Sequence, residues 1–269
     1  MILEPEIIQN IREGNVAAHN IGFTTTERCN LRCSVCYLGE PRRVDMNPEI
    51  PNEVFKHIKD TDAIFLGGAE SQLNPRGLEQ IANAAAKHGA KFKRLQFVTN
   101  GTFINKPFWE ILDGIMDANP MTRIYADISN DEWHKDSVEI KGYGVYKKLI
   151  YDNYEKLRQM YPQFDISIRS FMPYDESFIR PSGKGKYIEG NREFNEDRKD
   201  FKFDNDITVY KPFAGSSRGD RPVVDTIQFD AYGNTVQMWR DLQGREQENF
   251  GNIFKKPLPE IIIEHGYES

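Results

Sequence analysis

The chain has 269 residues, of which 39% are hydrophobic and 28% are charged, and its formal net charge at pH 7 is −6. That length fits one large α/β domain with a sizeable core, whereas the negative charge gives no general attraction for the phosphate backbone of nucleic acids. No apolar run approaches the roughly eighteen residues of a membrane span, and the first residues lack the pattern of a signal peptide, so we expect a cytoplasmic protein without a membrane segment.

The first elements expected are a helix over residues 5–17 and a short strand from residue 21 that leads into a loop. This loop holds all three cysteines of the chain, Cys29, Cys33 and Cys36, with the spacing Cys-x3-Cys-x2-Cys. Soft thiolate ligands from one loop favour an iron–sulfur cluster or zinc. A structural zinc site needs a fourth ligand, and the nearest candidates, His19 and Glu27, lack the usual spacing.

Two other roles for the cysteines are weaker. A disulfide framework does not suit an odd number of cysteines in a chain of this length. Isolated cysteines often only pack in a core, but packing does not explain why all three fall within eight residues of a polar loop. A metal or cluster site is therefore the leading interpretation.

The cysteine loop resembles the signature of the radical SAM superfamily, which has this spacing after the first barrel strand. The resemblance implies that Cys29, Cys33 and Cys36 bind three irons of a [4Fe–4S] cluster and that S-adenosylmethionine (SAM) binds the fourth. One electron then cleaves SAM to methionine and a 5′-deoxyadenosyl radical, which abstracts hydrogen from a substrate. The family usually has an aromatic residue, packed near the adenine, just before the third cysteine. Here Val35 has that place and Tyr37 follows, so both are candidate cofactor contacts, and Tyr37 is also a candidate catalytic residue.

Helices and strands alternate after the cysteine loop. Helices are expected over residues 52–60, 76–88, 108–117 and 143–161, and strands over residues 63–66, 95–98, 123–128, 164–171 and 207–210. This alternation implies right-handed βαβ units and a parallel sheet. Six strands predict an α/β fold, a partial (β/α)6 TIM-like barrel, which the resemblance also implies. We expect a core of residues 1–215 and a C-terminal extension of residues 216–269.

Glycines and an acid follow the second predicted strand, at the end where ligands bind in such folds. Gly67, Gly68 and Glu70 are similar to the family's glycine–glycine–acid motif, whose backbone lies against the methionine end of SAM. Glycines allow close approach of a ligand to the main chain, and Glu70 is placed to pair with the SAM ammonium group. A plain turn is the alternative.

Polar residues follow the next two strands as well. Asn100 lies in a Thr-Asn-Gly turn that looks like the family's turn after the third strand. Ser129 and Asp131 fall where the family commonly binds the ribose or the carboxylate of SAM. Both residue types also favour helix N-caps, which is the alternative role.

Arg169 lies on the fifth predicted strand. Period-2 alternation places it on one face with Asp165 and Ser167, opposite Ile166 and Ile168. An arginine that points into the barrel needs an anion, and the SAM carboxylate is the candidate. An outward, solvated arginine is the alternative.

Three further features carry weaker hypotheses. His134 is a candidate acid, base or ligand because imidazole titrates near neutral pH, although a histidine beside a tryptophan in a loop is more often a hydrogen-bonded structural residue. Two glycine-rich basic runs, residues 180–186 and 215–221, are suited to phosphate or carboxylate groups. Mobile surface loops are the alternative for both runs.

The C-terminal stretch predicts a hairpin over residues 226–238 and a segment, residues 250–254, that leads into a terminal helix. This is similar to the SPASM/twitch-like extension of radical SAM peptide-modifying enzymes. Those relatives have a cysteine after the hairpin's second strand, where this chain has Met238 and Trp239, and no cysteine follows Cys36. We therefore expect no auxiliary cluster, no sulfur insertion and no hydrogen return from a cysteine thiol.

The resemblance thus predicts a radical SAM enzyme with one [4Fe–4S] cluster, acting on a small molecule or a peptide. It also implies an electron donor such as flavodoxin or ferredoxin. Radical modification of a nucleoside or nucleotide is an alternative that the basic runs favour modestly. A non-enzymatic iron–sulfur or zinc binding module is the other.

Overall fold

The computed structural model describes residues 3–33, 36, 41–130, 134, 142–169, 207–211, 221–236 and 249–268. Its strands are β1 (Val16–Thr26), β2 (Ile58–Gly68), β3 (Lys91–Thr99), β4 (Arg123–Ser129), β5 (Asp165–Arg169), β6 (Ile207–Tyr210), β7 (Val223–Phe229), β8 (Asn234–Val236), β9 (Asn249–Asn252) and β10 (Gly266–Glu268). Its helices are α1 (Pro5–Arg12), α2 (Ile50–His57), α3 (Pro75–His88), α4 (Lys106–Ala118), α5 (Tyr143–Met160) and α7 (Leu258–His265), with a 3-10 turn, η1 (Ser71–Leu73).

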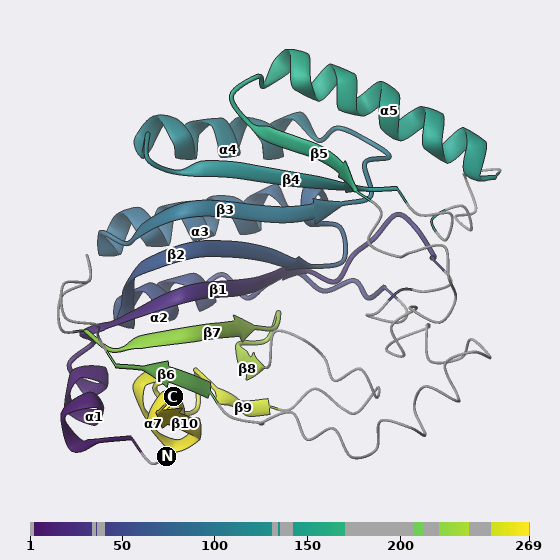
Figure 1. Ribbon diagram of the computed structural model, residues 1–269. Helices are drawn as coiled ribbons and strands as arrows, with labels where there is room; N and C mark the ends of the chain where they lie inside the picture. Colours follow the sequence, from purple (N-terminus) through teal and green to yellow (C-terminus); the bar gives the residue numbers. More distant parts are fainter. Residues whose placement is uncertain are drawn as a thin grey trace.

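These strands form one sheet with the order β10-β6-β7-β1-β2-β3-β4-β5, and β8 and β9 continue from β7 (Figure 1). The strands from β1 to β5 are all parallel, and the helices between them lie behind the sheet. The predicted parallel α/β sheet is therefore confirmed. No helix in the described segments is both long enough and apolar enough to cross a membrane.

The helix predicted over residues 5–17 is longer than the helix in the structure. The helix α1 ends at Arg12, and β1 already begins at Val16. Gly14, with φ +69°, lies in the left-handed region just after the helix, where glycine carries no Cβ penalty. The chain therefore reverses there and enters the sheet earlier than expected.

The sixth parallel strand is also not the one predicted. Residues 207–210 form β6, which pairs antiparallel with β7 and lies on the β1 side of the sheet, away from β5. The strand β7, from the predicted C-terminal extension, pairs parallel with β1, with Ile227 opposite Ile21 and Phe229 opposite Phe23. Six neighbouring strands of the sheet are thus parallel, but the sixth of them is β7, which lies next to β1 and not next to β5. The division of the chain at residues 215 and 216 stays a prediction.

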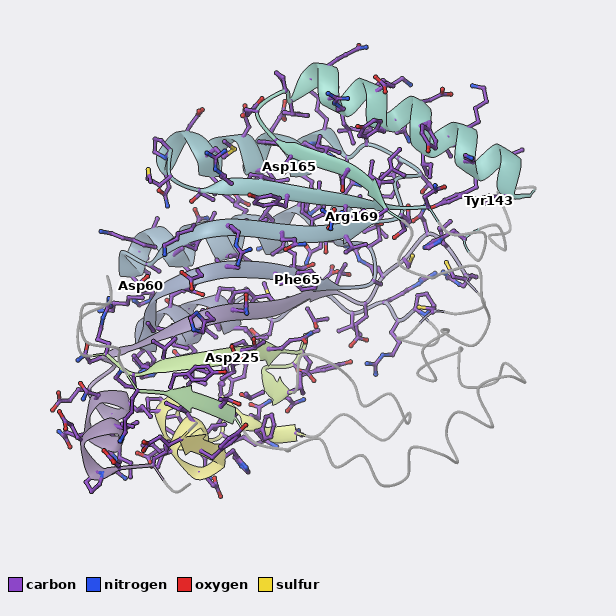
Figure 2. The ribbon with its side chains drawn as sticks, in the orientation of Figure 1. Asp60, Phe65, Tyr143, Asp165, Arg169 and Asp225 are labelled. Carbon is purple, nitrogen blue, oxygen red and sulfur yellow. The ribbon has the colours of Figure 1, made fainter. Side chains whose placement is uncertain are left out.

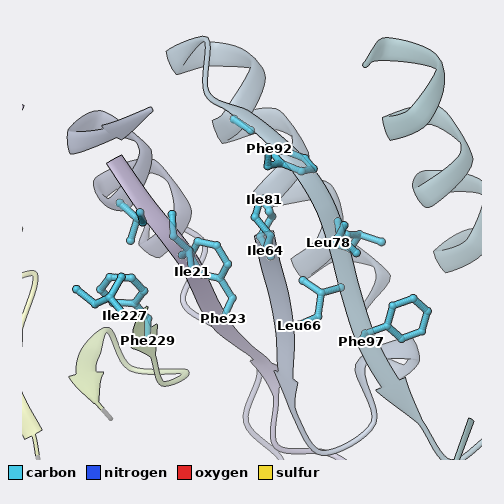
Figure 3. Packing of buried hydrophobic residues seen from close by; sticks show 14 of the residues in the cluster. Ile21, Phe23, Ile64, Leu66, Leu78, Ile81, Phe92, Phe97, Ile227 and Phe229 are labelled. Carbon is cyan, nitrogen blue, oxygen red and sulfur yellow. The ribbon is translucent and has the colours of Figure 1, made fainter. Parts of the chain in front are cut away.

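The core lies between the sheet and the helices. Alternate residues of β1, β2 and β3 point toward the helices, as period 2 requires, and form one core cluster with Leu78 and Ile81 of α3 (Figure 3). On β1 and β2 these residues are Ile21, Phe23, Ile64 and Leu66. The residues between them, such as Phe65, face the other side of the sheet. That side and the carboxyl ends of the parallel strands carry the polar side chains described next.

Candidate active site at the carboxyl ends of the parallel strands

The cysteine loop follows β1 at the edge where the parallel strands end (Figure 1). Cys29 and Cys33 are half-buried and pack against the core. The Cys29 sulfur accepts hydrogen bonds from the Leu31 backbone N–H at 3.3 Å and from Asn100 Nδ2 at 3.8 Å. Burial raises the pKa of the Cys29 thiol to about 11, because a buried thiolate without a metal loses hydration. N–H donors directed at sulfur suit a metal-bound thiolate.

The candidate zinc ligands outside the loop are engaged elsewhere. His19 Nδ1 lies 2.8 Å from Asp62 Oδ2, well before the end of β1. Glu27 accepts a hydrogen bond of 2.7 Å from Arg42 Nη2. Within the described residues, no three cysteine, histidine or acidic side chains are close enough to hold one metal ion. A four-iron cluster takes each thiolate on a different iron, so the donor set of this loop fits that group.

The last residue of β2, Gly68, has to be glycine, whereas Gly67 before it does not. Gly68 has φ +101°, and a Cβ there would lie 2.2 Å from the Thr26 carbonyl oxygen. A Cβ on Gly67 would make only ordinary contacts, the nearest at 3.5 Å to Gln228 Nε2. The next residues bind the entry to the cysteine loop, since Ala69 N–H donates to Thr26 O and Glu70 N–H to Arg28 O.

Glu70 is fully buried and bonded to the end of β3. Its Oε2 accepts from the Asn100 backbone N–H, and its Oε1 accepts from Thr99 Oγ1, both at 2.8 Å. Burial raises the pKa of Glu70 to about 7 in spite of these donors. The carboxylate therefore joins the ends of β2 and β3, and its predicted contact with the SAM ammonium group stays a prediction.

Asn100 presents its side chain to the cysteine loop. Besides the Cys29 sulfur, Nδ2 reaches Asn30 Oδ1 at 2.9 Å. The single Tyr146 O–H is shared between the carbonyl oxygens of Asn100, at 3.0 Å, and of Ser129, at 2.5 Å. His134 stacks on the Tyr146 ring at 5.4 Å. The structure thus brings the predicted residues Asn100, Ser129 and His134 together around Tyr146, with Asn100 in contact with the cysteine loop.

Arg169 lies on the predicted polar face and has a carboxylate partner within the chain. Its Nε lies 2.9 Å from Asp127 Oδ1 and 2.9 Å from Ser167 Oγ. Ser167 and Gln96 also donate to Asp127, which is 5% exposed, whereas the arginine side chain is 57% exposed. Figure 2 shows Arg169 and Phe65 on the same side of the sheet. Asp127 was not predicted as a site residue from the sequence. A signal for it exists, because Asp127 is the one carboxylate in a strand that also holds the apolar residues Ile124, Ala126 and Ile128.

The C-terminal hairpin also contacts the site. The strands β7 and β8 pair antiparallel, as predicted. At the turn between them, the Ala231 carbonyl oxygen accepts from Asn47 N–H at 2.9 Å, and the Arg42 guanidinium lies 5.9 Å from the Tyr232 ring centroid. Arg42 is the partner of Glu27, two residues before Cys29. Some of the predicted positions lie outside the described residues. These are Val35, Tyr37, Asp131, Met238 and Trp239, the run of residues 180–186, and the run of residues 215–221 apart from Arg221.

A half-barrel of parallel strands with a three-cysteine loop at its carboxyl edge defines a class of cofactor-dependent enzymes. Residues 23–177 match the family model described as Radical SAM superfamily. The chain belongs to the radical SAM superfamily, whose enzymes use a [4Fe–4S] cluster and SAM. Comparison with curated proteins found no match.

Two solved structures resemble the chain. One is anSMEcpe with bound AdoMet and Cp18Cys peptide, with a TM-score of 0.54 and 13% identity over 92% of this chain and 80% of that chain. The other is Streptococcus suis SuiB bound to precursor peptide SuiA, with a TM-score of 0.42 and 11% identity over 96% of this chain and 67% of that chain. At these identities the likeness concerns the fold alone.

Proposed function

We propose that this enzyme holds a single [4Fe–4S] cluster through Cys29, Cys33 and Cys36, cleaves SAM reductively and abstracts hydrogen from a peptide. The observation that carries this proposal is the position of the three thiols. They lie in one loop at the carboxyl edge of β1; Cys29 is bonded to Asn100, and the entry to the loop is bonded to Ala69 and Glu70 after β2. When bound, the cluster supplies the electron that breaks the sulfonium bond of SAM.

The chain's own residues then bind and orient SAM. Gly67 leaves room for a ligand to approach its backbone, because no described neighbour would clash with a Cβ there. In the contacts described, Arg169 binds Asp127 and Ser167 through Nε alone, and its side chain is more than half exposed. We assign it to an anionic group, the carboxylate of SAM. Glu70 could pair with the SAM ammonium group only by exchanging donors that it already has.

The remaining cofactor contacts follow from the family resemblance. Val35 and Tyr37 are proposed at the adenine, and Ser129 and Asp131 at the ribose or carboxylate. His134 and Tyr37 stay the candidates for a catalytic role. A flavodoxin or ferredoxin is the proposed electron donor, and a cytoplasmic location is proposed because an iron–sulfur cluster with reduced thiols suits a reducing compartment.

A peptide substrate is favoured over a small molecule by the fold likeness to anSMEcpe, a protein whose structure holds a Cp18Cys peptide. The sheet face opposite the helices also carries hydrogen-bonding side chains on several strands, such as Gln96, Ser167 and Gln228. Amide and hydroxyl groups of this kind match the donors and acceptors of a peptide backbone.

Anaerobic reconstitution tests the cluster and the cleavage. The wild-type chain should show a [4Fe–4S] EPR spectrum that SAM perturbs, and it should form 5′-deoxyadenosine under dithionite. A variant with Cys29, Cys33 and Cys36 all changed to alanine should do neither. Stable zinc binding by the wild type, without a cluster or cleavage, would contradict the proposal.

Deuterium transfer tests the substrate class. Cells grown in deuterated medium yield a peptide fraction and a small-molecule fraction, and each is incubated with the loaded enzyme and unlabelled SAM. Deuterium in 5′-deoxyadenosine should appear with the peptide fraction. Label arising from the small-molecule fraction alone would replace the peptide proposal with the small-molecule alternative.

A further inference from the structure

The Asn100 side chain points at a cluster ligand from outside the cysteine loop. Asn100 follows β3 directly and is 6% exposed. Its Nδ2 lies 3.8 Å from Cys29 Sγ and 2.9 Å from Asn30 Oδ1. The two N–H bonds of this amide nitrogen therefore have two separate acceptors, of which one is the sulfur.

The orientation of this amide is determined by its neighbour Thr102. The Thr102 backbone N–H lies 3.0 Å from Asn100 Oδ1. A backbone N–H only donates, so the oxygen of the amide must face Thr102 and the nitrogen must face Cys29. Thr102 Oγ1 also donates to Asn100 Oδ1 at 2.7 Å and accepts from Asn30 Nδ2 at 2.8 Å. The three side chains thus form a closed ring of hydrogen bonds.

The backbone of Asn100 is held on both sides. The buried Glu70 carboxylate accepts from its N–H at 2.8 Å, and the Tyr146 hydroxyl donates to its C=O at 3.0 Å. A donor whose backbone and amide plane are both held needs little reordering when the sulfur carries charge.

We propose that Asn100 tunes the reduction potential of the cluster through the Nδ2–H···Sγ hydrogen bond to Cys29. This inference rests on the proposed function, in which Cys29 binds iron. Reduction adds negative charge to a cluster and its thiolates, and a hydrogen bond to a ligand sulfur stabilises that charge. The bond therefore raises the potential. Asn100 acts on the cluster through Cys29, which makes it a positioning residue.

Asn100→Asp tests the bond with little change of shape. The aspartate keeps an oxygen for the Thr102 N–H but replaces the donor at the sulfur with a carboxylate oxygen. EPR-monitored redox titration of the loaded protein without SAM should show a midpoint that is more negative than that of the wild type. A tenfold decrease in the equilibrium constant for one-electron reduction corresponds to a shift of about 59 mV in the midpoint potential. Asn100→Ala, which removes the donor without adding charge, should shift the midpoint in the same direction by less.

Thr102→Val is the matched control. It breaks the ring by removing the hydroxyl but keeps the backbone N–H that orients Asn100, so the bond to sulfur survives. Its unfolding midpoint should fall while its reduction midpoint stays at the wild-type value. A general disturbance of the loop would instead move the potentials of all three variants together.

The outcomes separate the inference from the proposed function. A wild type that forms no [4Fe–4S] signal contradicts the cluster assignment itself. A wild type with the cluster and with unshifted midpoints in both Asn100 variants overturns the inference and leaves the ring a structural element. If neither variant loads a cluster, pulsed EPR of the wild type labelled with 15N at the asparagine side chains decides. A nitrogen coupling to the reduced cluster supports the bond, and its absence overturns it.

Discussion

Gly67 and Gly68 meet different constraints although they are adjacent. Gly68 combines a φ of +101° with a Cβ position 2.2 Å from a backbone oxygen, whereas Gly67 has neither constraint. One glycine is thus required by the fold, whereas a methyl group at the other would only make ordinary van der Waals contacts within the protein. Substitution at the two positions separates folding from cofactor binding.

Gly68→Ala should lower the free energy of unfolding by about 1–3 kcal/mol or more, because an L-residue is strained at this φ and its Cβ collides with Thr26. Gly67→Ala should keep the stability of the wild type but weaken SAM binding, since its new methyl group occupies the space beside the ligand. Urea unfolding and SAM titration of the loaded protein measure the two effects. A Gly67→Ala variant with unchanged SAM affinity would contradict the assigned contact.

Glu70 should make stability depend on pH. Burial raises its pKa from the ordinary 4.5 to about 7. Between these values the folded state holds a proton that the unfolded state has released, so stability falls as pH rises, by up to about 3 kcal/mol.

Glu70→Gln removes this titration, so the slope of unfolding free energy between about pH 5 and pH 8 should become flatter in the cluster-free protein. Urea unfolding across this range measures it. An equal slope in both proteins would mean that Glu70 does not titrate there.

At the scale of elements, one buried glutamine connects three of them. Gln72, in η1, donates from Nε2 to Thr99 Oγ1 at 2.8 Å, at the end of β3. Its Oε1 accepts from Trp109 Nε1 at 2.7 Å and from the Asn105 backbone N–H at 3.1 Å, at the start of α4. The hydrogen bonds of Gln72 share Thr99 Oγ1 with those of Glu70 and hold the ends of the strands in place.

Gln72→Met keeps the volume of the side chain but leaves two buried donors, Trp109 Nε1 and Asn105 N–H, without an acceptor. We expect a loss of about 1–3 kcal/mol for each. Gln163→Met is the control, because the Gln163 side chain bonds Asp113 at the surface and should change stability by about 0.5 kcal/mol at most. Urea unfolding of both variants tests this, and equal losses would refute the role of the network.

At the scale of the whole molecule, the C-terminal segment completes the sheet. The strand β7 hydrogen-bonds to β1, and Phe229 stacks on Phe23 at 5.9 Å. The two ends of the chain lie together near the edge of the sheet that β6 and β10 form (Figure 1), where Lys211 pairs with Glu4 and Glu268. The predicted extension is thus hydrogen-bonded to the strand that carries the cysteine loop.

Phe229→Ala should therefore destabilise the whole sheet, by about 3–5 kcal/mol, because the ring is fully buried in the core. Phe254→Ala is the control, since that ring is 43% exposed and should cost much less. Urea unfolding should remain a single transition in both variants. A separate early transition in Phe229→Ala, with the rest of the sheet intact, would support an extension that unfolds as an independent domain.

Patterns local in the chain were enough to predict several features. The cysteine spacing indicated a metal or cluster site and, through its resemblance to the radical SAM signature, the cofactors. The alternation of helices and strands indicated the parallel sheet, and period 2 placed Arg169 on a polar face with Ser167. Each of these rests on residues near one another in sequence, where covalent geometry sets which side chains share a face or a loop.

Only the tertiary structure decided which distant groups meet. Asp127 beside Arg169, the Asn100 amide at Cys29, the donors around Glu70 and the pairing of β7 with β1 all join separate elements. Periodicity states which face a residue occupies but carries no information on which strand lies next to it or in what register. These partners follow from the packing of the whole sheet, and they determine how the strand ends hold the cysteine loop.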